Sequence, residues 1–387
     1  MDKVTETTRV SLGGRLRESL IGVLIGLFLL IACPILLFWN EGRAITTAQS
    51  LEEGAAVTIP VAADPVLPAN EGRLIHVSGQ LRVDRNLTDR MFGVEARAVR
   101  LARQAEMFQW IESKSSETRT KIGGGQETAT TYSYSRDWSS KPVDSSAFKE
   151  PAGHDNPPMA IRDRQIETEQ ARLGDFVLGT TLLRKLDNAR PLPLSKEQVN
   201  AIRAAYKGER PLHLLDDRIF IGADPLAPTV GDYRISYEIV PEGPVSIVAR
   251  QNGRGLGEYQ TVAGDALLLV AAGEIPASEM FAEAQADNEL LSWIIRIGGI
   301  LFLGVGLMMV LRPFAILADI VPLFGSLVSF GQGVIALCFG LLVGSTIIAV
   351  AWLYYRPLVA ALVLAFGLAT TAGIIWLAKR RKAAQMA

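Results

Sequence analysis

The stretch LIGVLIGLFLLIACPILLFW, residues 20–39, decides the fold class because it contains twenty consecutive residues without a charge. At 1.5 Å per helical residue, it is about as long as the ~30 Å hydrocarbon core of a bilayer. Three further mostly apolar stretches follow late in the chain, at residues 291–311, 334–353 and 358–377. The sequence therefore predicts an integral membrane protein with four transmembrane helices, one N-terminal and three C-terminal.

The interval between the first two predicted helices, residues 40–290, is long enough for a domain of ordinary size. Its sequence alternates at Arg73–Val83, as a half-buried strand does. Val99–Glu112 and Thr128–Trp138 are rich in β-branched and aromatic residues, and they flank the three glycines 123–125, which predicts a long hairpin. Further predicted strands are Asp175–Leu186, Arg218–Gly222, Tyr233–Val240, Val245–Gln251 and Ala266–Ala271. We expect one large β-rich α+β domain, inserted between spans 1 and 2.

Two helices are predicted beside these strands. Ser195 and Gln198 have the spacing of a capping box ahead of the residues 199–206. A second helix begins near Ser278 and continues into the predicted span at 291–311. Residues 312–333 are apolar but interrupted by two helix-breaking residues, which predicts a cytoplasmic interfacial or re-entrant segment.

Basic residues predict the orientation of the chain in the membrane. Arg15 and Arg17 precede the first predicted span, and four basic residues, 379–382, follow the last. Such residues favour the cytoplasmic side, so both termini, residues 1–19 and 378–387, are expected there and the large domain is expected to be extracytoplasmic or lumenal. The first span is interpreted as a retained anchor rather than a cleaved signal. The membrane would be the inner cell membrane in a bacterium, and the endoplasmic reticulum or inner nuclear membrane in a eukaryote.

Composition excludes several functional classes. The net charge of −1 argues against nucleic-acid binding. The two cysteines, Cys33 and Cys338, both fall in predicted spans, so the large domain has neither a disulfide framework nor a thiolate metal site. No acidic or histidine residue lies deep in a span, which disfavours a pump or secondary transporter. We expect no catalytic, cofactor-binding or metal-binding residues and no cofactor. Enzymatic activity stays open, although the sequence leans against it.

Asn40, Glu41 and Arg43 follow the first span directly, at the level where lipid headgroups lie. They and Arg296, which lies one turn inside the second span, are candidate headgroup or interface residues. An arginine there could hold a lipid phosphate through two hydrogen bonds. The alternative is a turn that ends the span without any specific partner, with Arg296 reaching to the interface.

Small residues recur at every fourth position in the last two spans, and such spacing lets helix backbones approach closely. The alternative is that alanine and glycine are simply common in membrane helices. The candidate helix-packing residues are Ala336, Gly340, Gly344, Ala361, Ala365, Ala369 and Gly373. In the large domain, His154 and Asn156 form a dense polar group. A catalytic or metal-binding role is one interpretation, and a rigid turn ending in two prolines is the other.

The same motifs resemble the transmembrane protein 43 family, also called LUMA, nearly from end to end. The residues that carry the resemblance are Asn40-Glu41-Gly42-Arg43, Asn70-Glu71-Gly72-Arg73, Met107-Phe108-Gln109-Trp110, Tyr132-Ser133-Tyr134, Trp138, Gly153-His154, Asn156-Pro157, Gly231-Asp232, Val248-Ala249-Arg250-Gln251 and Tyr355-Arg356-Pro357-Leu358. The resemblance implies four spans, a lumenal domain, self-association and, for animal members, nuclear envelope organisation through lamins and emerin. It supplies no catalytic residues.

These observations predict a non-enzymatic scaffold that organises a membrane. Its expected partners are membrane lipids, further copies of itself and other membrane or envelope proteins, but no nucleic acid. The alternative is a lipid-handling protein or one associated with lipid metabolism. That alternative requires an apolar cleft on which groups such as His154, Glu112 or Arg43 converge.

Overall fold

The computed structural model describes residues 3–215 and 218–357, which divide into a strand-rich unit and a helical unit. Among these residues, the strand-rich unit holds 3–8, 50–118, 128–215 and 218–284, and the helical unit holds 9–49, 119–127 and 285–357.

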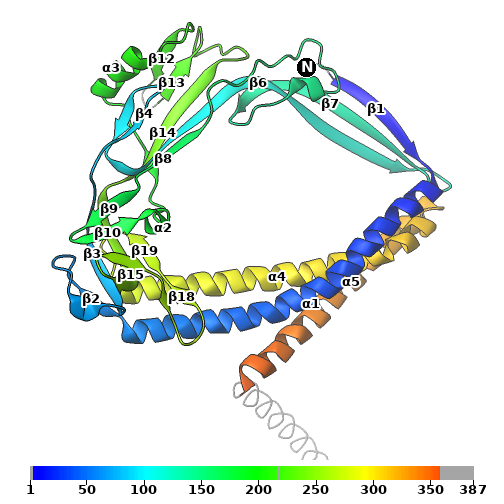
Figure 1. Ribbon diagram of the computed structural model, residues 1–387. Helices are drawn as coiled ribbons and strands as arrows, with labels where there is room; N and C mark the ends of the chain where they lie inside the picture. The colour runs from blue at the N-terminus through cyan, green and yellow to red at the C-terminus, as the bar shows by residue number, and fades with distance from the viewer. Residues whose placement is uncertain (1–2, 216–217, 358–387) are drawn as a thin grey trace, which may run out of the picture. The chain divides into compact units, whose positions relative to one another are not determined.

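A long hairpin is the centre of the first sheet of the strand-rich unit (Figure 1). Its arms are β6 (Ala98–Thr120) and β7 (Gln126–Ser139), which confirms the predicted hairpin and lengthens it. The strand order is β1-β7-β6-β14-β13-β12, with β8 also on β6 and β11 on β14. Alternate residues of β6, including Leu101 and Met107, are buried against Ile235 of β14. The remaining bounds are β1 (Lys3–Val10), β8 (Arg164–Glu167), β11 (Arg190–Pro191), β12 (Leu212–Leu215), β13 (Arg218–Ile221) and β14 (Tyr233–Pro241).

The second sheet is built on the antiparallel pair of β3 (Leu74–Val83) and β15 (Gly243–Asn252), and both strands were predicted. Its order is β10-β9-β3-β15-β16, with β19 on β15 and β2 parallel to β3. The prediction of one strand over residues 175–186 was wrong in its second half, because α2 (Thr180–Leu183) follows β10 (Phe176–Gly179) and buries two leucines. The other strands of this sheet are β2 (Ile59–Val61), β9 (Gln170–Leu173), β16 (Gly255–Gly257) and β19 (Leu269–Ala272). Two separate pairs are β4 (Leu87–Asp89) with β5 (Val94–Ala96) and β17 (Tyr259–Gln260) with β18 (Ala266–Leu267), and the 3₁₀ turns are η1 (Pro68–Asn70) and η2 (Ser145–Ala147).

The predicted capping box is present at α3 (Lys196–Ala205). The Ser195 hydroxyl accepts from the backbone N–H of Gln198 at 3.3 Å, and the Gln198 side chain accepts from the backbone N–H of Ser195 at 2.8 Å. Two otherwise unpaired donors of the first turn are thereby satisfied. Ile202 then anchors the helix, because its side chain is completely buried in the core of the first sheet.

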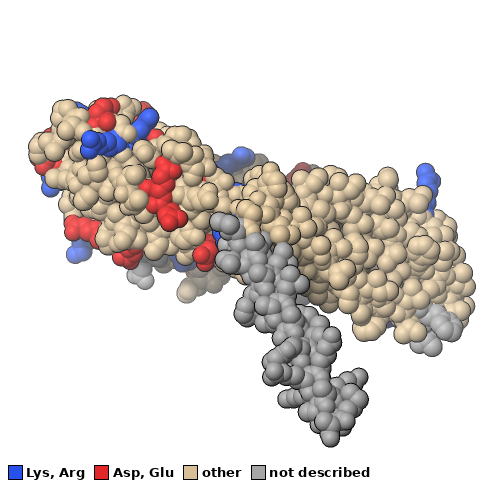
Figure 2. All heavy atoms as spheres, turned by 90° about the horizontal axis from the view of Figure 1, so that it is seen from below, with Lys and Arg blue, Asp and Glu red and all other residues tan. Residues whose placement is uncertain are grey.

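Three helices of the described chain are long and apolar enough to cross a membrane: α1 (Leu12–Val57), α4 (Ala277–Ala318) and α5 (Pro322–Tyr355). They contain the first three predicted spans, and the fourth, 358–377, lies outside the described residues. Figure 2 shows charged side chains gathered over the strand-rich unit, whereas the helical unit presents almost none on that face. The helices exceed the predicted spans because their ends have other partners.

The two helix ends that belong to the strand-rich unit explain this extra length. Leu51 near the end of α1 packs with Met280 and Phe281 near the start of α4, together with Val248 of the second sheet. The helix predicted to start near Ser278 and to continue through the second span is therefore confirmed. The predicted interfacial or re-entrant segment, residues 312–333, contains the end of α4, a break after Ala318 and the start of α5. Its place at the cytoplasmic face stays a prediction. Pro322 occupies the first turn of α5, where a missing N–H costs nothing.

The amino-terminal residues form a strand instead of a free tail. In the strand-rich unit, β1 pairs with β7, and the hydroxyl oxygens of Thr5 and Thr131 are 3.2 Å apart. In the helical unit, the glycine turn of the hairpin meets the start of α1, where Arg15 donates to the Gly124 carbonyl at 2.6 Å and pairs with Asp319 at 2.5 Å. The predicted orientation separates residues 1–19 from the hairpin by a membrane. These contacts count against that separation, and the orientation stays a prediction.

Candidate functional site

A buried ion pair joins the three apolar helices. Glu41 of α1 accepts two hydrogen bonds from Arg296 of α4, from Nε and Nη2 at 2.6 Å each, and a third from Trp352 Nε1 of α5 at 2.9 Å. The carboxylate side chain is 2% exposed and the guanidinium side chain 15%. The planar guanidinium matches a carboxylate in only a few orientations, so this pair restricts how α1 and α4 align. Trp352 adds α5 to the same carboxylate.

A second arginine beside the pair has only neutral partners. Arg43 donates from Nη1 to Asn288 Oδ1 at 3.0 Å, and from Nη2 to Ser292 Oγ at 2.9 Å and Asn40 Oδ1 at 3.3 Å. Asn288 in turn donates to the Ala44 carbonyl at 2.9 Å. Arg43 Nε is buried without a hydrogen-bond partner, and no carboxylate of the described residues pairs with this side chain. Its charge is thus dispersed over amides and a hydroxyl.

The structure brings together all four candidate headgroup residues, Asn40, Glu41, Arg43 and Arg296, but it bonds them to one another and to partners that the sequence did not suggest. We call the complete set, which adds Asn288, Ser292 and Trp352, the polar cluster. Residues 288, 292 and 296 are polar at every fourth position of α4, which places them on one helix face. That spacing was the signal in the sequence that could have found them. A headgroup role for the four residues stays a prediction.

The glycine of the Asn-Glu-Gly-Arg motif has a steric function. A Cβ at Gly42 would lie 2.5 Å from the ring carbon Cζ of Tyr355, so only glycine lets this ring pack against α1. Phe38, one turn earlier, lies with its ring centroid 5.7 Å from that of Tyr354 and 5.3 Å from that of Tyr355. Gly42 and Tyr355, more than 300 residues apart in sequence, therefore meet at one end of the bundle.

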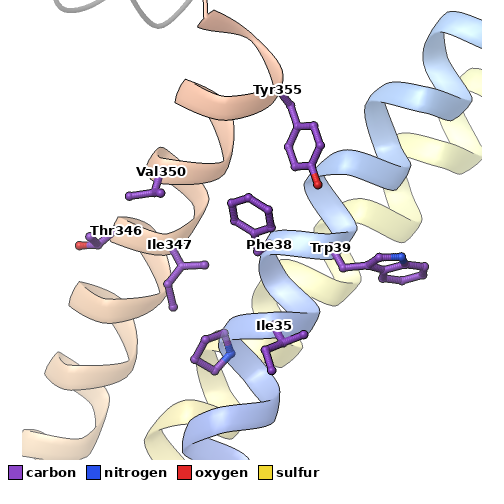
Figure 3. Close-up of a pocket in the computed structure, with 8 residues that line it drawn as sticks. Ile35, Phe38, Trp39, Thr346, Ile347, Val350 and Tyr355 are labelled. Atoms are coloured by element: carbon purple, nitrogen blue, oxygen red, sulfur yellow. The ribbon is translucent and has the colours of Figure 1, made fainter.

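An apolar groove of about 490 Å³ lies next to this contact, between α1 and α5 (Figure 3). In Figure 3, Phe38 and Ile347 lie between the two helices, and Tyr355 stands at one end. The lining residues are Pro34, Ile35, Phe38, Trp39, Thr346, Ile347, Val350 and Tyr355. Among the described lining residues, Thr346 and Tyr355 carry hydroxyl groups, and most of the others offer hydrophobic contact.

The described small residues of α5 pack against α4. A Cβ at Gly340 would lie 2.6 Å from the Ile300 carbonyl oxygen, and one at Gly344 would lie 2.5 Å from the Ile300 side chain. Ala336 is buried opposite Gly304. The four other candidates, Ala361, Ala365, Ala369 and Gly373, lie outside the described residues. The first series thus lies at a contact between helices of one chain.

In the strand-rich unit, His154 and Asn156 hold a turn against the hairpin. Asn156 accepts from the backbone N–H of Trp110 at 2.7 Å and donates to the carbonyl of the same residue at 2.9 Å, as a neighbouring strand would. The ring of His154 stacks on Tyr134 with centroids 4.0 Å apart, and Tyr134 donates to Glu112 at 2.9 Å. This geometry supports the interpretation as a rigid turn. The described residues contain no group of three metal-ligating side chains.

A buried ion pair in the first sheet was missed by the sequence reasoning. Asp89 accepts from Arg103 Nη1 at 2.7 Å and from the Tyr237 hydroxyl at 2.7 Å, and all three side chains are nearly inaccessible. Burial, followed by the hydrogen bond to Asp89, raises the pKa of Tyr237 well above its ordinary value. The three residues come from β4, β6 and β14, so the group stabilises the core of the unit.

Comparison with known proteins gives one consistent family. The family model described as transmembrane protein 43 matches residues 107–357. Transmembrane protein 43 of Rattus norvegicus is 35% identical over 93% of this chain and 91% of its own length, and that of Homo sapiens is 34% identical over the same shares. A transmembrane protein 43 homolog of Drosophila melanogaster is 30% identical over 92% of this chain and 95% of its own length. No solved structure matches. The chain therefore belongs to the transmembrane protein 43 family.

Proposed function

We propose that this protein is a non-enzymatic scaffold that organises its membrane by holding the strand-rich unit on a fixed helical anchor. The observation that carries the proposal is the closed polar cluster. Glu41 and Arg296 satisfy each other, so the charged groups nearest to the membrane helices stabilise helix packing and are not presented to a substrate. Charged groups in membrane helices usually have a function, and here that function is structural.

The partners of such a scaffold would be other membrane proteins or further copies of the chain. The proposed location is the inner membrane of a bacterium, or the endoplasmic reticulum or inner nuclear membrane of a eukaryote. The basic residues at both termini support an orientation with the large domain outside the cytoplasm. The contacts of β1 with β7 make that orientation the part of the proposal most in need of a test.

Photocrosslinking in native membranes tests the scaffold role. A photoreactive amino acid replaces Leu226, whose side chain is 95% exposed on a loop of the strand-rich unit, or Val262, which is equally exposed. Ile202, completely buried, is the matched control position. We expect the exposed positions to capture a small set of defined proteins and the buried one to capture none. Only uncrosslinked monomer at both exposed positions would refute the scaffold role.

Lipid handling by the large domain has less support. It requires groups such as His154, Glu112 or Arg43 to converge on a cleft. His154 and Glu112 instead contact Tyr134 where a turn packs against the hairpin, and Arg43 belongs to the polar cluster. The observation that favours some lipid contact is the apolar groove between α1 and α5. Lipid analysis of the crosslinked sample tests this alternative in the same experiment.

A further inference from the structure

We propose that the groove between α1 and α5 binds one acyl chain of an anionic phospholipid, whose phosphate is held by Arg356. This site does not depend on the scaffold role, and it involves none of the four residues that the sequence suggested for a headgroup.

The groove is about as long as the hydrocarbon part of one membrane leaflet is thick. Along α5 it extends from Thr346 to Tyr355, which is about 14 Å of helix at 1.5 Å per residue. Half of the ~30 Å hydrocarbon core is about 15 Å. Its exposed lining residues include Ile35 and Val350, so an acyl chain can enter from the side without passing through the protein. The groove therefore fits a single hydrocarbon chain lying along the helices.

One end of the groove is at the level of the headgroups. Trp39 and Tyr355 line that end, and amphipathic aromatic rings concentrate at the membrane interface. The polar residues Asn40 and Glu41 follow Trp39 at once, so the apolar part of α1 stops where the groove stops. A chain in the groove would consequently have its glycerol and phosphate beside Tyr355.

Arg356 supplies the complementary charge at that end. It is the next residue after Tyr355, its side chain is exposed, and its backbone N–H caps α5 by donating to the Trp352 carbonyl at 2.8 Å. Glu41, the acidic side chain of the polar cluster, is already occupied by Arg296 and Trp352. No carboxylate of the described residues forms an ion pair with Arg356. A guanidinium without a counter-ion at the interface matches a phosphate, with which it forms two parallel hydrogen bonds.

The experiment uses the full chain, purified in a mild detergent and reconstituted into nanodiscs with equal amounts of phosphatidylglycerol and phosphatidylcholine. Native mass spectrometry after release from the discs measures the lipid that stays bound. The wild-type protein should retain one phospholipid, with phosphatidylglycerol in excess. Val350→Trp, which fills the groove, should lose most of it. Leu342→Trp is the matched control, because residue 342 lies on the same helix, is 71% exposed and does not line the groove.

Arg356→Gln separates the phosphate contact from the acyl-chain contact, because the Arg356 side chain is exposed and does not line the groove. It should lower the preference for phosphatidylglycerol roughly tenfold, as expected for one charge-assisted hydrogen-bonded pair. Arg312→Gln, at the other end of α4's apolar stretch, should keep the wild-type preference. Equal retention by the Val350→Trp and Leu342→Trp proteins would overturn the site, as would an unchanged preference in Arg356→Gln. Wild-type protein that retains no lipid would also overturn it, and would make residues 358–377 the occupant to examine.

Discussion

Replacing Glu41 by glutamine should strongly destabilise the helical unit. The substitution preserves the shape of the side chain but leaves Arg296, 15% exposed, without its counter-ion. Breaking a buried pair in this way costs about 3–5 kcal/mol, mostly because the remaining charge is still buried. For a unit of this size, that corresponds to a fall of roughly 10 °C in the unfolding temperature.

Thermal unfolding of the purified full chain in detergent, followed by tryptophan fluorescence, measures this effect because Trp352 donates to the same carboxylate. A double-mutant cycle with Arg296→Gln should show that the double variant is more stable than the sum of the two single effects predicts. Glu167→Gln is the matched control. Its partner Arg184 is 68% exposed, so the change should cost no more than about 1 kcal/mol. A cost of less than 1 kcal/mol for Glu41→Gln, or a coupling energy near zero, would refute the structural role of the pair.

Three further outcomes are expected. Thr5→Cys and Thr131→Cys, in a chain without other cysteines, should form a disulfide in native membranes. Two unlinked thiols that are labelled from opposite sides of the membrane would instead support the orientation predicted from charge. The pKa of Tyr237 is raised in the folded protein, so above about pH 10 the unfolded chain loses the phenolic proton more readily than the folded one. The free energy of unfolding should therefore fall above that pH. Tyr237→Phe should make this fall smaller in alkaline denaturation curves. Asn156→Ala should leave two backbone groups of Trp110 unpaired, cost about 1–3 kcal/mol and speed hydrogen exchange near residues 143–158. Unchanged exchange there would contradict the role of Asn156 in holding the turn against the hairpin.

The elements predicted well from the sequence are those whose pattern is local. The hairpin of β6 and β7 was visible because β-branched and aromatic runs flank three glycines, and α3 because its capping box is a four-residue signal. The length of α1 was not visible. Beyond Trp39 the helix loses its uniform apolar character and keeps only scattered core residues such as Leu51, whose partners Met280 and Phe281 lie far along the chain. Hydropathy finds the part of a helix that lipid surrounds, and misses the part that a protein core stabilises.

The candidate site also depends on contacts between residues that are far apart in the sequence. The sequence singled out Glu41, Arg43 and Arg296 because charges beside apolar runs are unusual. They were candidate headgroup or interface residues, with a turn that lacks a specific partner as the alternative, because no protein partner was apparent in the sequence. The partnership of Glu41 with Arg296 joins residues 255 positions apart, and it depends on how two helices align along their axes. Helix alignment is decided by contacts such as Gly26 against Gly306, where an added Cβ would lie 2.5 Å from a carbonyl oxygen. No single-chain pattern reports such a contact.

Three arginines near one end of the bundle, Arg296, Arg43 and Arg356, have three different environments. The environment decides whether an arginine stabilises the helices or is free to bind a ligand. Arg296 has a carboxylate, so its charge is neutralised within the protein. Arg43 has amides and a hydroxyl, which hold its guanidinium in place and leave its Nε sealed from any ligand. Arg356 is exposed, beside an apolar groove that ends at the aromatic residues of the interface. Phosphate binding requires an accessible guanidinium whose charge is not already neutralised, and only the third environment provides it. Glu41, Arg43 and Arg296 therefore find their hydrogen-bond partners within the helical unit, and for this reason we place the proposed lipid contact at Arg356.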